Sequence, residues 1–181
     1  MPIRKVIYVE DQRLRQKANT VRAFTPTLKD LAQDMLETMR NYEGVGLAGP
    51  QIGVMQRIFV AEISSSKKED ETPHPQSGVS YVLVNPKIIK TAQNLVEGKE
   101  GCLSIPNWAG CVERPEWVEV MAQDLEGRPF KLKVDNLLAR IFQHEIDHLN
   151  GVLYIDHITD PDKLWRTDSE EETNKARTTT V

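Results

Sequence analysis

The sequence predicts an α+β fold, a compact single domain of mainly antiparallel strands packed around a central helix, with another helix near the N-terminus. Three observations support this fold class. Apolar residues recur at helical spacing in residues 26–41, they alternate with polar residues in short runs between residues 57 and 134, and helical spacing returns in residues 135–151. This order of helix, strands, hairpin and helix is typical of an α+β domain.

The first helix is expected over residues 26–41. Four apolar side chains recur there at helical spacing: Leu28, Leu31, Met35 and Met39. We interpret this stripe as core packing. Thr25 or Thr27 can cap the start of the helix.

The middle of the chain is expected to form strands. Residues 57–63 and 81–89 are rich in β-branched and aromatic side chains, which is typical of strands. Between them, residues 64–80 are polar and rich in Ser and Pro, as in a surface loop. Residues 117–134 alternate on both sides of Glu126-Gly127, which indicates a hairpin.

The length of 181 residues and the hydrophobic content of 39% fit one domain, which we assign to residues 1–166. Residues 167–181 are almost entirely polar, and we expect this C-terminal tail to be disordered. The net charge is −4 and no basic stripe is visible, which argues against specific DNA binding. No apolar run approaches the ~18 residues of a membrane span. The N-terminal apolar patch is too short for a signal peptide, so we expect a cytoplasmic protein.

The last predicted helix carries chemically active side chains. Asp135 is a good N-cap residue, and Asn150-Gly151 is a good C-cap. At about 100° per residue the side chains fall into three sectors. The apolar sector, expected to face the core, holds Leu138, Phe142, Ile146 and Leu149. The polar sector, expected to face water, holds Arg140, Gln143 and Asp147. The third sector mixes polar and aliphatic groups, as the wall of a cleft does: Leu137, Ile141, His144, Glu145 and His148.

The stretch QHEIDHLNG, residues 143–151, indicates a metal site. His144 and His148 are four residues apart and project from the same side of a helix, so both can bind one ion. Glu145 follows the first histidine and is placed to act as a general base toward water. The alternative is an ordinary amphipathic helix whose histidines are hydrogen-bonded or solvent-exposed. His157 has no partner at this spacing, and we interpret it as structural.

A catalytic site of this kind usually has three protein ligands. The extended pattern HExxHxxGxxH is absent, because Tyr154 stands where its last histidine would be. Cys102 and Cys111 both stay candidates, since a thiolate is a good ligand for Zn²⁺ or Fe²⁺. Either can instead be a buried cysteine without a ligating role. A reducing compartment argues against a disulfide between them.

Two glycine-containing segments are expected to shape the site. In EGCLSIP, residues 100–106, Gly101 permits a close backbone approach and Pro106 is expected to end the segment. GVGLAGPQIG, residues 44–53, fits no phosphate-binding pattern. It is either a helix C-terminal turn that leads to a strand, or a backbone track on which an extended ligand lies as an added strand. In both cases the amide of Gln51 can donate to a developing oxyanion.

Taken together and in this order, the segments at residues 44–53, 100–106 and 143–151 resemble those of bacterial-type peptide deformylases, and the resemblance extends from about Ile3 to Ile158. It implies a catalytic domain at residues 1–166 that removes the formyl group from N-formylmethionyl nascent polypeptides. It also implies one divalent metal ion per chain, natively often Fe²⁺, with Zn²⁺, Ni²⁺ or Co²⁺ also accepted. A monomer with transient ribosome contact is expected.

The resemblance assigns roles position by position. The implied metal ligands are Cys102, His144 and His148. Glu145 is implied to be the general base and later the acid, while Gln51 and the backbone N–H of Leu103 stabilise the oxyanion. The residues implied to lie along the peptide are Val45, Gly46, Glu100 and Gly101. Leu137 and Ile141 are implied to line the methionine pocket, and the helical sectors independently place both beside the histidines.

Three features depart from the family pattern. Gly49 stands where members commonly have a second alanine. Asn107, Trp108 and Ala109 follow the proline of EGCLSIP, where many bacterial members have an arginine, and this affects how the peptide beyond methionine is held. Residues 64–80 are a candidate insertion near the cleft.

Two rival functions follow from the same residues. One is another metallohydrolase, such as a peptidase that uses the same HExxH pattern. The other is a binding module with a structural metal. The presence of Glu145 argues against the second, because a closed structural site needs no general base.

Overall fold

The computed structural model describes residues 2–63 and 76–168. Its α-helices in these ranges are α1 (Pro26–Asn41) and α2 (Asn136–Leu149). Its strands are β1 (Gly46–Ala48), β2 (Ile58–Glu62), β3 (Ser80–Thr91), β4 (Leu95–Cys102), β5 (Ile105–Pro115), β6 (Trp117–Gln123), β7 (Pro129–Asp135) and β8 (Leu164–Arg166). Short 3-10 helices are η1 (Gln12–Arg15), η2 (Gly49–Ile52), η3 (Tyr154–His157) and η4 (Pro161–Lys163).

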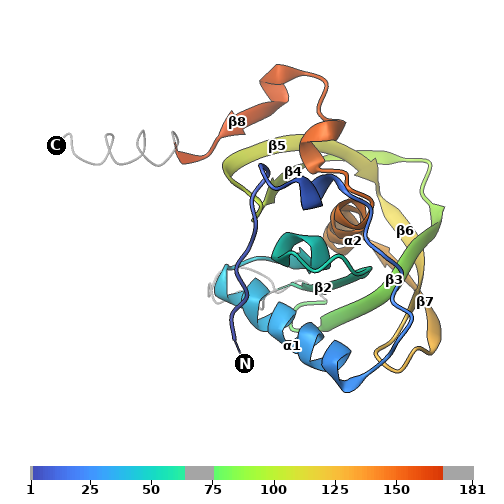
Figure 1. Ribbon diagram of the computed structural model, residues 1–181. Helices are drawn as coiled ribbons and strands as arrows, with labels where there is room; N and C mark the ends of the chain where they lie inside the picture. Colours follow the sequence, from blue (N-terminus) through green and yellow to red (C-terminus); the bar gives the residue numbers. More distant parts are fainter. Residues whose placement is uncertain (1, 64–75, 169–181) are drawn as a thin grey trace.

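The strands form two antiparallel sheets with a helix between them. The larger sheet has the order β1-β2-β3-β6-β7, and the smaller one has the order β4-β5-β8. Helix α2 lies in the middle of the molecule between the sheets, and α1 lies on the other side of β2 (Figure 1). Glu116 alone separates β5 from β6, so the chain passes directly from one sheet to the other. The predicted α+β class, with antiparallel strands around a central helix, is confirmed.

Strand β2 shows how the core is divided between the two helices. Ile58 and Val60 pack in the cluster that contains the apolar face of α1. Phe59 and Ala61 point to the opposite side and pack with the apolar residues of α2. Since successive side chains of a strand face opposite sides, both faces of β2 are covered, and this explains its continuous apolar run.

The predicted helices and the hairpin are confirmed. The four stripe residues of α1 are at most 8% exposed: Leu28, Leu31, Met35 and Met39. Strands β6 and β7 flank a turn in which Gly127 has a φ of 82°, a value that suits glycine. Thr25 and Asp135 do occupy the N-cap positions, but neither side chain makes a capping hydrogen bond.

Strands β4 and β5 were missed by sequence reasoning. Pro106 was expected to end its segment, and this is wrong, because the chain turns between Cys102 and Ile105 and Pro106 lies inside β5. Gly and charged residues interrupt the apolar pattern of β4, so its alternation is weak.

The expectation that one sector of α2 faces water is also wrong. Gln143 is 5% exposed, and the side chains of Arg140 and Asp147 are 13% and 20% exposed. The ribbon of β4 and β5 covers this side of the helix, and its residues form ion pairs with both charged side chains. The charged residues of this sector thus bind α2 to the smaller sheet.

Some expectations concern residues outside the described ranges. These are residues 64–75 of the predicted loop and residues 169–181 of the polar tail. Within residues 2–63 and 76–168, none of the helices combines the length and apolar character needed to cross a membrane.

Candidate active site

A cavity of about 510 Å³ opens where α2, β4 and the edge strand β1 meet. Every site residue that the resemblance implies, except His148, lines it. Those residues are Val45, Gly46, Gln51, Glu100, Gly101, Cys102, Leu103, Leu137, Ile141, His144 and Glu145. The cavity therefore joins the three segments that carry the resemblance.

The three potential metal ligands meet at the C-terminal end of β4: Cys102, His144 and His148. Their potential ligand atoms all lie within 4.8 Å of one another, and Sγ of Cys102 is 3.2 Å from Nε2 of His148. The thiol comes from the smaller sheet, whereas both imidazoles come from α2. The other candidate, Cys111, pairs with Lys99 in the β4–β5 ribbon and lies outside this group. Both cysteines are free thiols, as expected.

The charges in the group favour the thiolate form of Cys102. Burial alone would raise the pKa of this thiol, but the positive character of His148 and His144 holds it well below its usual range. The same pairing, with a contribution from Glu100, raises the pKa of His144 above its ordinary value against the effect of burial. A thiolate is the form of cysteine that binds a metal ion.

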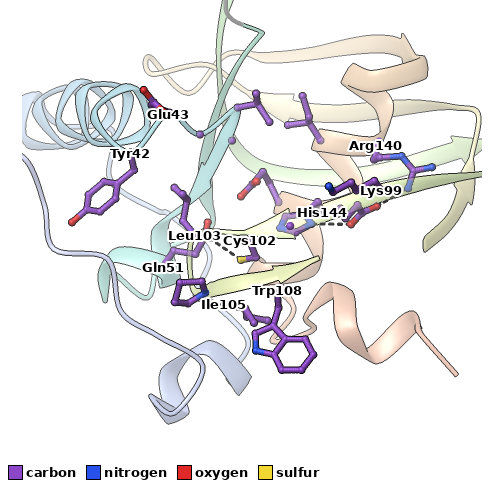
Figure 2. A pocket seen from close by; sticks show the side chains of 18 of the residues that line it. Tyr42, Glu43, Gln51, Lys99, Cys102, Leu103, Ile105, Trp108, Arg140 and His144 are labelled. Carbon is purple, nitrogen blue, oxygen red and sulfur yellow. Dashed lines mark hydrogen bonds and ion pairs between the residues drawn. The ribbon is translucent and has the colours of Figure 1, made fainter. Parts of the chain in front are cut away.

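The carboxylate of Glu100 contacts the ring of His144 at Nδ1. Its Oε2 lies 2.9 Å from Nδ1 of His144, which leaves Nε2 of this ring free for the site. Arg114 donates to both carboxylate oxygens, at 2.7 and 2.9 Å, and Arg140 donates to Oε1 at 2.7 Å. Burial would raise the pKa of Glu100, but the hydrogen bonds and charges of Arg114 and His144 outweigh it and hold the pKa below its usual range. Figure 2 shows this series of contacts, from Arg140 through the carboxylate to His144.

Sequence reasoning missed this support. It placed Glu100 beside the peptide, but its side chain is occupied by His144 and two arginines, so only its backbone is available in that role. Arg114 also donates to Asp147 of α2 at 2.7 Å, and Asp147 in turn contacts His157 at 2.8 Å. His157 lies outside the group of potential ligands, in agreement with the structural role expected for it. No local signal reveals these partners, because they are distant in the sequence.

Glu145 is buried beside the backbone of β1. It is 3% exposed, and its Oε2 has no hydrogen-bond partner among the described residues. Burial raises its pKa to about 7, although the neighbouring histidines act in the opposite direction. A Cβ added at Gly46 would lie 2.3 Å from Oε1 of Glu145, so only glycine leaves room for this carboxylate. A buried carboxylate with such a pKa is suited to proton transfer near neutral pH.

Gln51 is held with its amide group toward the thiol. Its Oε1 accepts a hydrogen bond of 2.7 Å from the backbone N–H of Ala48. Its Nε2 therefore points the other way, 3.5 Å from Sγ of Cys102 and 3.4 Å from Oγ of Ser104 (Figure 2). Leu103 lies in the turn that follows Cys102. The amide of Gln51 therefore faces the region of the three potential ligands.

The remaining candidates form a groove between two backbones. β1 is an edge strand of the larger sheet, so one side of Gly46 is not paired within that sheet. Gly101 of β4 lines the same cavity. Val45 and Leu137 are each 42% exposed, whereas Ile141 is 4% exposed. The first interpretation of residues 44–53 is found, since the segment leaves α1 through a turn and enters strand β1.

Comparisons with known proteins agree with this geometry. A profile of the polypeptide deformylase family matches residues 3–164. The peptide deformylase of Thermomicrobium roseum is 46% identical over 99% of this chain and 100% of its own length. The enzyme of Mesorhizobium japonicum is 44% identical over 88% of this chain and 86% of its own length.

Solved structures give the same result. The peptide deformylase of Synechococcus elongatus superposes with a TM-score of 0.80 at 40% identity, covering 90% of this chain and 82% of that one. The enzyme of Legionella pneumophila has a TM-score of 0.78 at 39% identity, covering 99% and 100%. On sequence, fold and site, this chain belongs to the polypeptide deformylase family.

Proposed function

We propose that Cys102, His144 and His148 bind one divalent metal ion, and that Glu145 transfers the proton when this chain hydrolyses the formyl group of N-formylmethionyl peptides. Removal of the N-formyl group from nascent peptides is the reaction of the family. The main support for this assignment is that the potential ligand atoms of one thiol and two imidazoles lie within 4.8 Å of one another, next to a buried carboxylate.

The donor set fits a catalytic metal site. One thiolate and two imidazoles suit Zn²⁺ and Fe²⁺, and three protein ligands leave a coordination position for water or substrate. The contact of Glu100 with Nδ1 of His144 is the kind of support that metal-binding histidines usually have. When bound, the ion supplies a Lewis acid that polarises the formyl carbonyl and makes water more acidic. The resemblance to the family is the reason to favour Fe²⁺ as the native ion, and the thiolate and imidazoles also accept Zn²⁺, Ni²⁺ and Co²⁺.

Glu145 is proposed to move the proton. Its unpaired Oε2 can take a proton from the water molecule that attacks the formyl carbon. Burial raises the pKa of this carboxyl, which suits it to accept this proton and return it to the departing amine. The carboxylate occupies the space that a side chain at position 46 would fill, so glycine there allows this placement.

Gln51 and Leu103 are proposed to stabilise the negative charge that develops on the formyl oxygen. Ala48 fixes the orientation of the Gln51 amide, so that Nε2 is already directed into the site before the substrate arrives. The backbone N–H of Leu103 is the second donor, next to the thiol. Preorganised donors of this kind are each worth about 10²–10³ in rate.

The groove is proposed to bind the peptide as an added strand. The edge of β1 at Val45 and Gly46 and the backbone of Glu100 and Gly101 would contact the main chain of the substrate. The methionine side chain would lie against Leu137 and Ile141, which also line the cavity. We expect a monomer as the active unit. The nascent state of the substrate is the reason to expect a transient contact with the ribosome.

The direct test is amine release from formyl-Met-Ala-Ser before and after removal of metal by a chelator. We expect hydrolysis that stops with the chelator and returns when Fe²⁺, Ni²⁺ or Co²⁺ is added. Acetyl-Met-Ala-Ser and an unformylated peptide with internal bonds serve as controls and should stay intact. Cleavage of internal peptide bonds in preference to the formyl group would instead indicate the rival peptidase.

A further inference from the structure

The site is assembled from two layers of the molecule. Cys102 belongs to the smaller sheet, whereas His144 and His148 belong to α2, which packs against the larger sheet. The substrate groove lies along the same boundary. Any side chain that fixes β4 relative to α2 therefore also fixes the width of the cavity.

Arg140 of α2 makes such a connection. Its Nη1 donates to Oε1 of Glu100 at 2.7 Å and to the carbonyl of Val112 at 2.8 Å. Its Nη2 donates to the carbonyl of Val96 at 2.6 Å. A longer contact of 3.4 Å joins Nη1 to the carbonyl of Gly98. One guanidinium thus binds both strands of the ribbon, and its side chain is 13% exposed.

Gly98 makes room for this arrangement. A Cβ at Gly98 would lie 2.8 Å from Cζ and Nη2 of Arg140 and 2.9 Å from Nε. The backbone of Gly98 does not have a positive φ, so alanine there would conflict only with the guanidinium, which would have to shift. The guanidinium therefore lies directly on the backbone of β4.

Arg140 also belongs to the wall of the cavity. It lines the same space as Leu137 and Ile141, the proposed methionine contacts. Figure 2 shows Arg140 and Lys99 on one side of the cavity and Tyr42 and Glu43 on the opposite side. A shift of the guanidinium would change the space available to the first side chain of the substrate.

We propose that Arg140, lying on Gly98, is a positioning and specificity-determining residue that fixes β4 against α2 and thereby limits the pocket to a side chain of the size of methionine. This inference rests on the proposed function. Arg140 acts through the wall that it forms and not on the reacting atoms. In its absence Glu100 keeps both hydrogen bonds from Arg114, so His144 keeps its partner and metal binding is expected to persist.

The test compares Arg140→Leu, Gly98→Ala, the double variant and a control, Arg128→Leu, whose side chain is 73% exposed in the β6–β7 turn. For each protein, kcat and KM are measured with formyl-Met and formyl-Phe peptides, together with metal content and melting temperature. We expect Arg140→Leu to retain one metal ion per chain and to raise KM for the formyl-Met peptide more than it lowers kcat. The preference for formyl-Met over formyl-Phe should fall about tenfold. Arg128→Leu should match the unmodified protein.

The double variant tests the link between the two residues. Gly98→Ala should impair the unmodified protein but add no further loss to Arg140→Leu, because the group that it displaces is already absent. Losses that multiply would overturn the proposal. So would an unchanged preference in Arg140→Leu, because a merely structural role lowers activity toward both peptides equally.

A second variant covers the case in which Arg140→Leu fails to fold. Lysine at this position keeps a positive charge but lacks the planar group that lies on Gly98. Gly98→Ala should then impair Arg140→Lys less than it impairs the unmodified protein, and an equal loss in both would overturn the proposal. Absence of deformylation by the unmodified protein would contradict the proposed function, which is a different result.

Discussion

Nδ1 of His144 and Oε2 of Glu100 lie 2.9 Å apart, although the two residues are on different layers and 44 positions apart in the chain. The same carboxylate accepts two hydrogen bonds from Arg114. The orientation of a proposed metal ligand is therefore tied to a buried ion pair between strands.

Replacement of this carboxylate should affect both metal binding and stability. In Glu100→Gln, His144 loses a charged acceptor, and we expect metal affinity or activity to fall about 10–100-fold. Arg114 keeps its hydrogen bond to Asp147 but loses the charge of its bidentate partner, so the free energy of unfolding should fall by about 1–3 kcal/mol. Competition with a chelator measures the first effect, and denaturant unfolding measures the second. Glu97→Gln, an exposed acid on the same strand, is the control, and equal effects of the two substitutions would contradict this account.

Substitution of Gly46 should impair the reaction through Glu145. The added methyl group of Gly46→Ala would lie 2.3 Å from Oε1, so the carboxylate must move. A displacement of about 1 Å of a catalytic group can cost about 10² in rate. We expect kcat to fall by about this factor with normal metal content. A variant with unchanged kcat would show that the position of Glu145 is not critical.

Removal of the general base should separate metal binding from turnover. Glu145→Ala leaves the three proposed ligands intact, so metal content should stay near one ion per chain. Activity should fall by at least about 10²–10⁴. Because the buried Oε2 has no partner among the described residues, loss of the carboxylate should not lower the melting temperature. Near-normal deformylation in this variant would exclude Glu145 as the base.

Acid stability should depend in part on Glu62. The hydrogen bond from Arg40 is the largest cause that holds the pKa of this carboxyl below its ordinary value of 4.5, and Ser80 contributes as well. Because the pKa is lowered on folding, the charged form stabilises the protein above about pH 4.5, and this stabilisation is lost as the pH falls through the lower, folded pKa. Glu62→Gln should reduce the free energy of unfolding by up to about 1 kcal/mol at pH 7 and by much less near pH 3. Urea unfolding at both pH values checks this, and an equal difference at both would contradict it.

The sequence predicts those parts of the molecule in which one short segment carries a complete pattern. The stripe of α1, the alternation of β6 and β7 and the spacing of His144 and His148 are local features, and each is found as expected. The two faces of α2 that hold apolar and ligand-forming residues also follow from helical geometry alone.

The parts that the sequence does not predict depend on contacts between distant segments. The polar sector of α2 was expected to face water, but Arg140 and Asp147 contact the β4–β5 ribbon, and no local pattern indicates that ribbon. The carboxylate of Glu100 was missed as a support of His144 for the same reason. A charged side chain is predicted to be solvent-exposed unless its partners are known. The partners of Glu100 are Arg114 and His144, which lie 14 and 44 positions away in the sequence.

The most direct measurement is the metal content of purified Cys102→Ser and Cys111→Ser. Cys102 lies 3.2 Å from Nε2 of His148, whereas Cys111 lies outside the group of potential ligands. We predict that Cys102→Ser loses most of its metal and that Cys111→Ser retains about one ion per chain. Equal metal content in the two variants would remove Cys102 from the site and contradict the proposed centre.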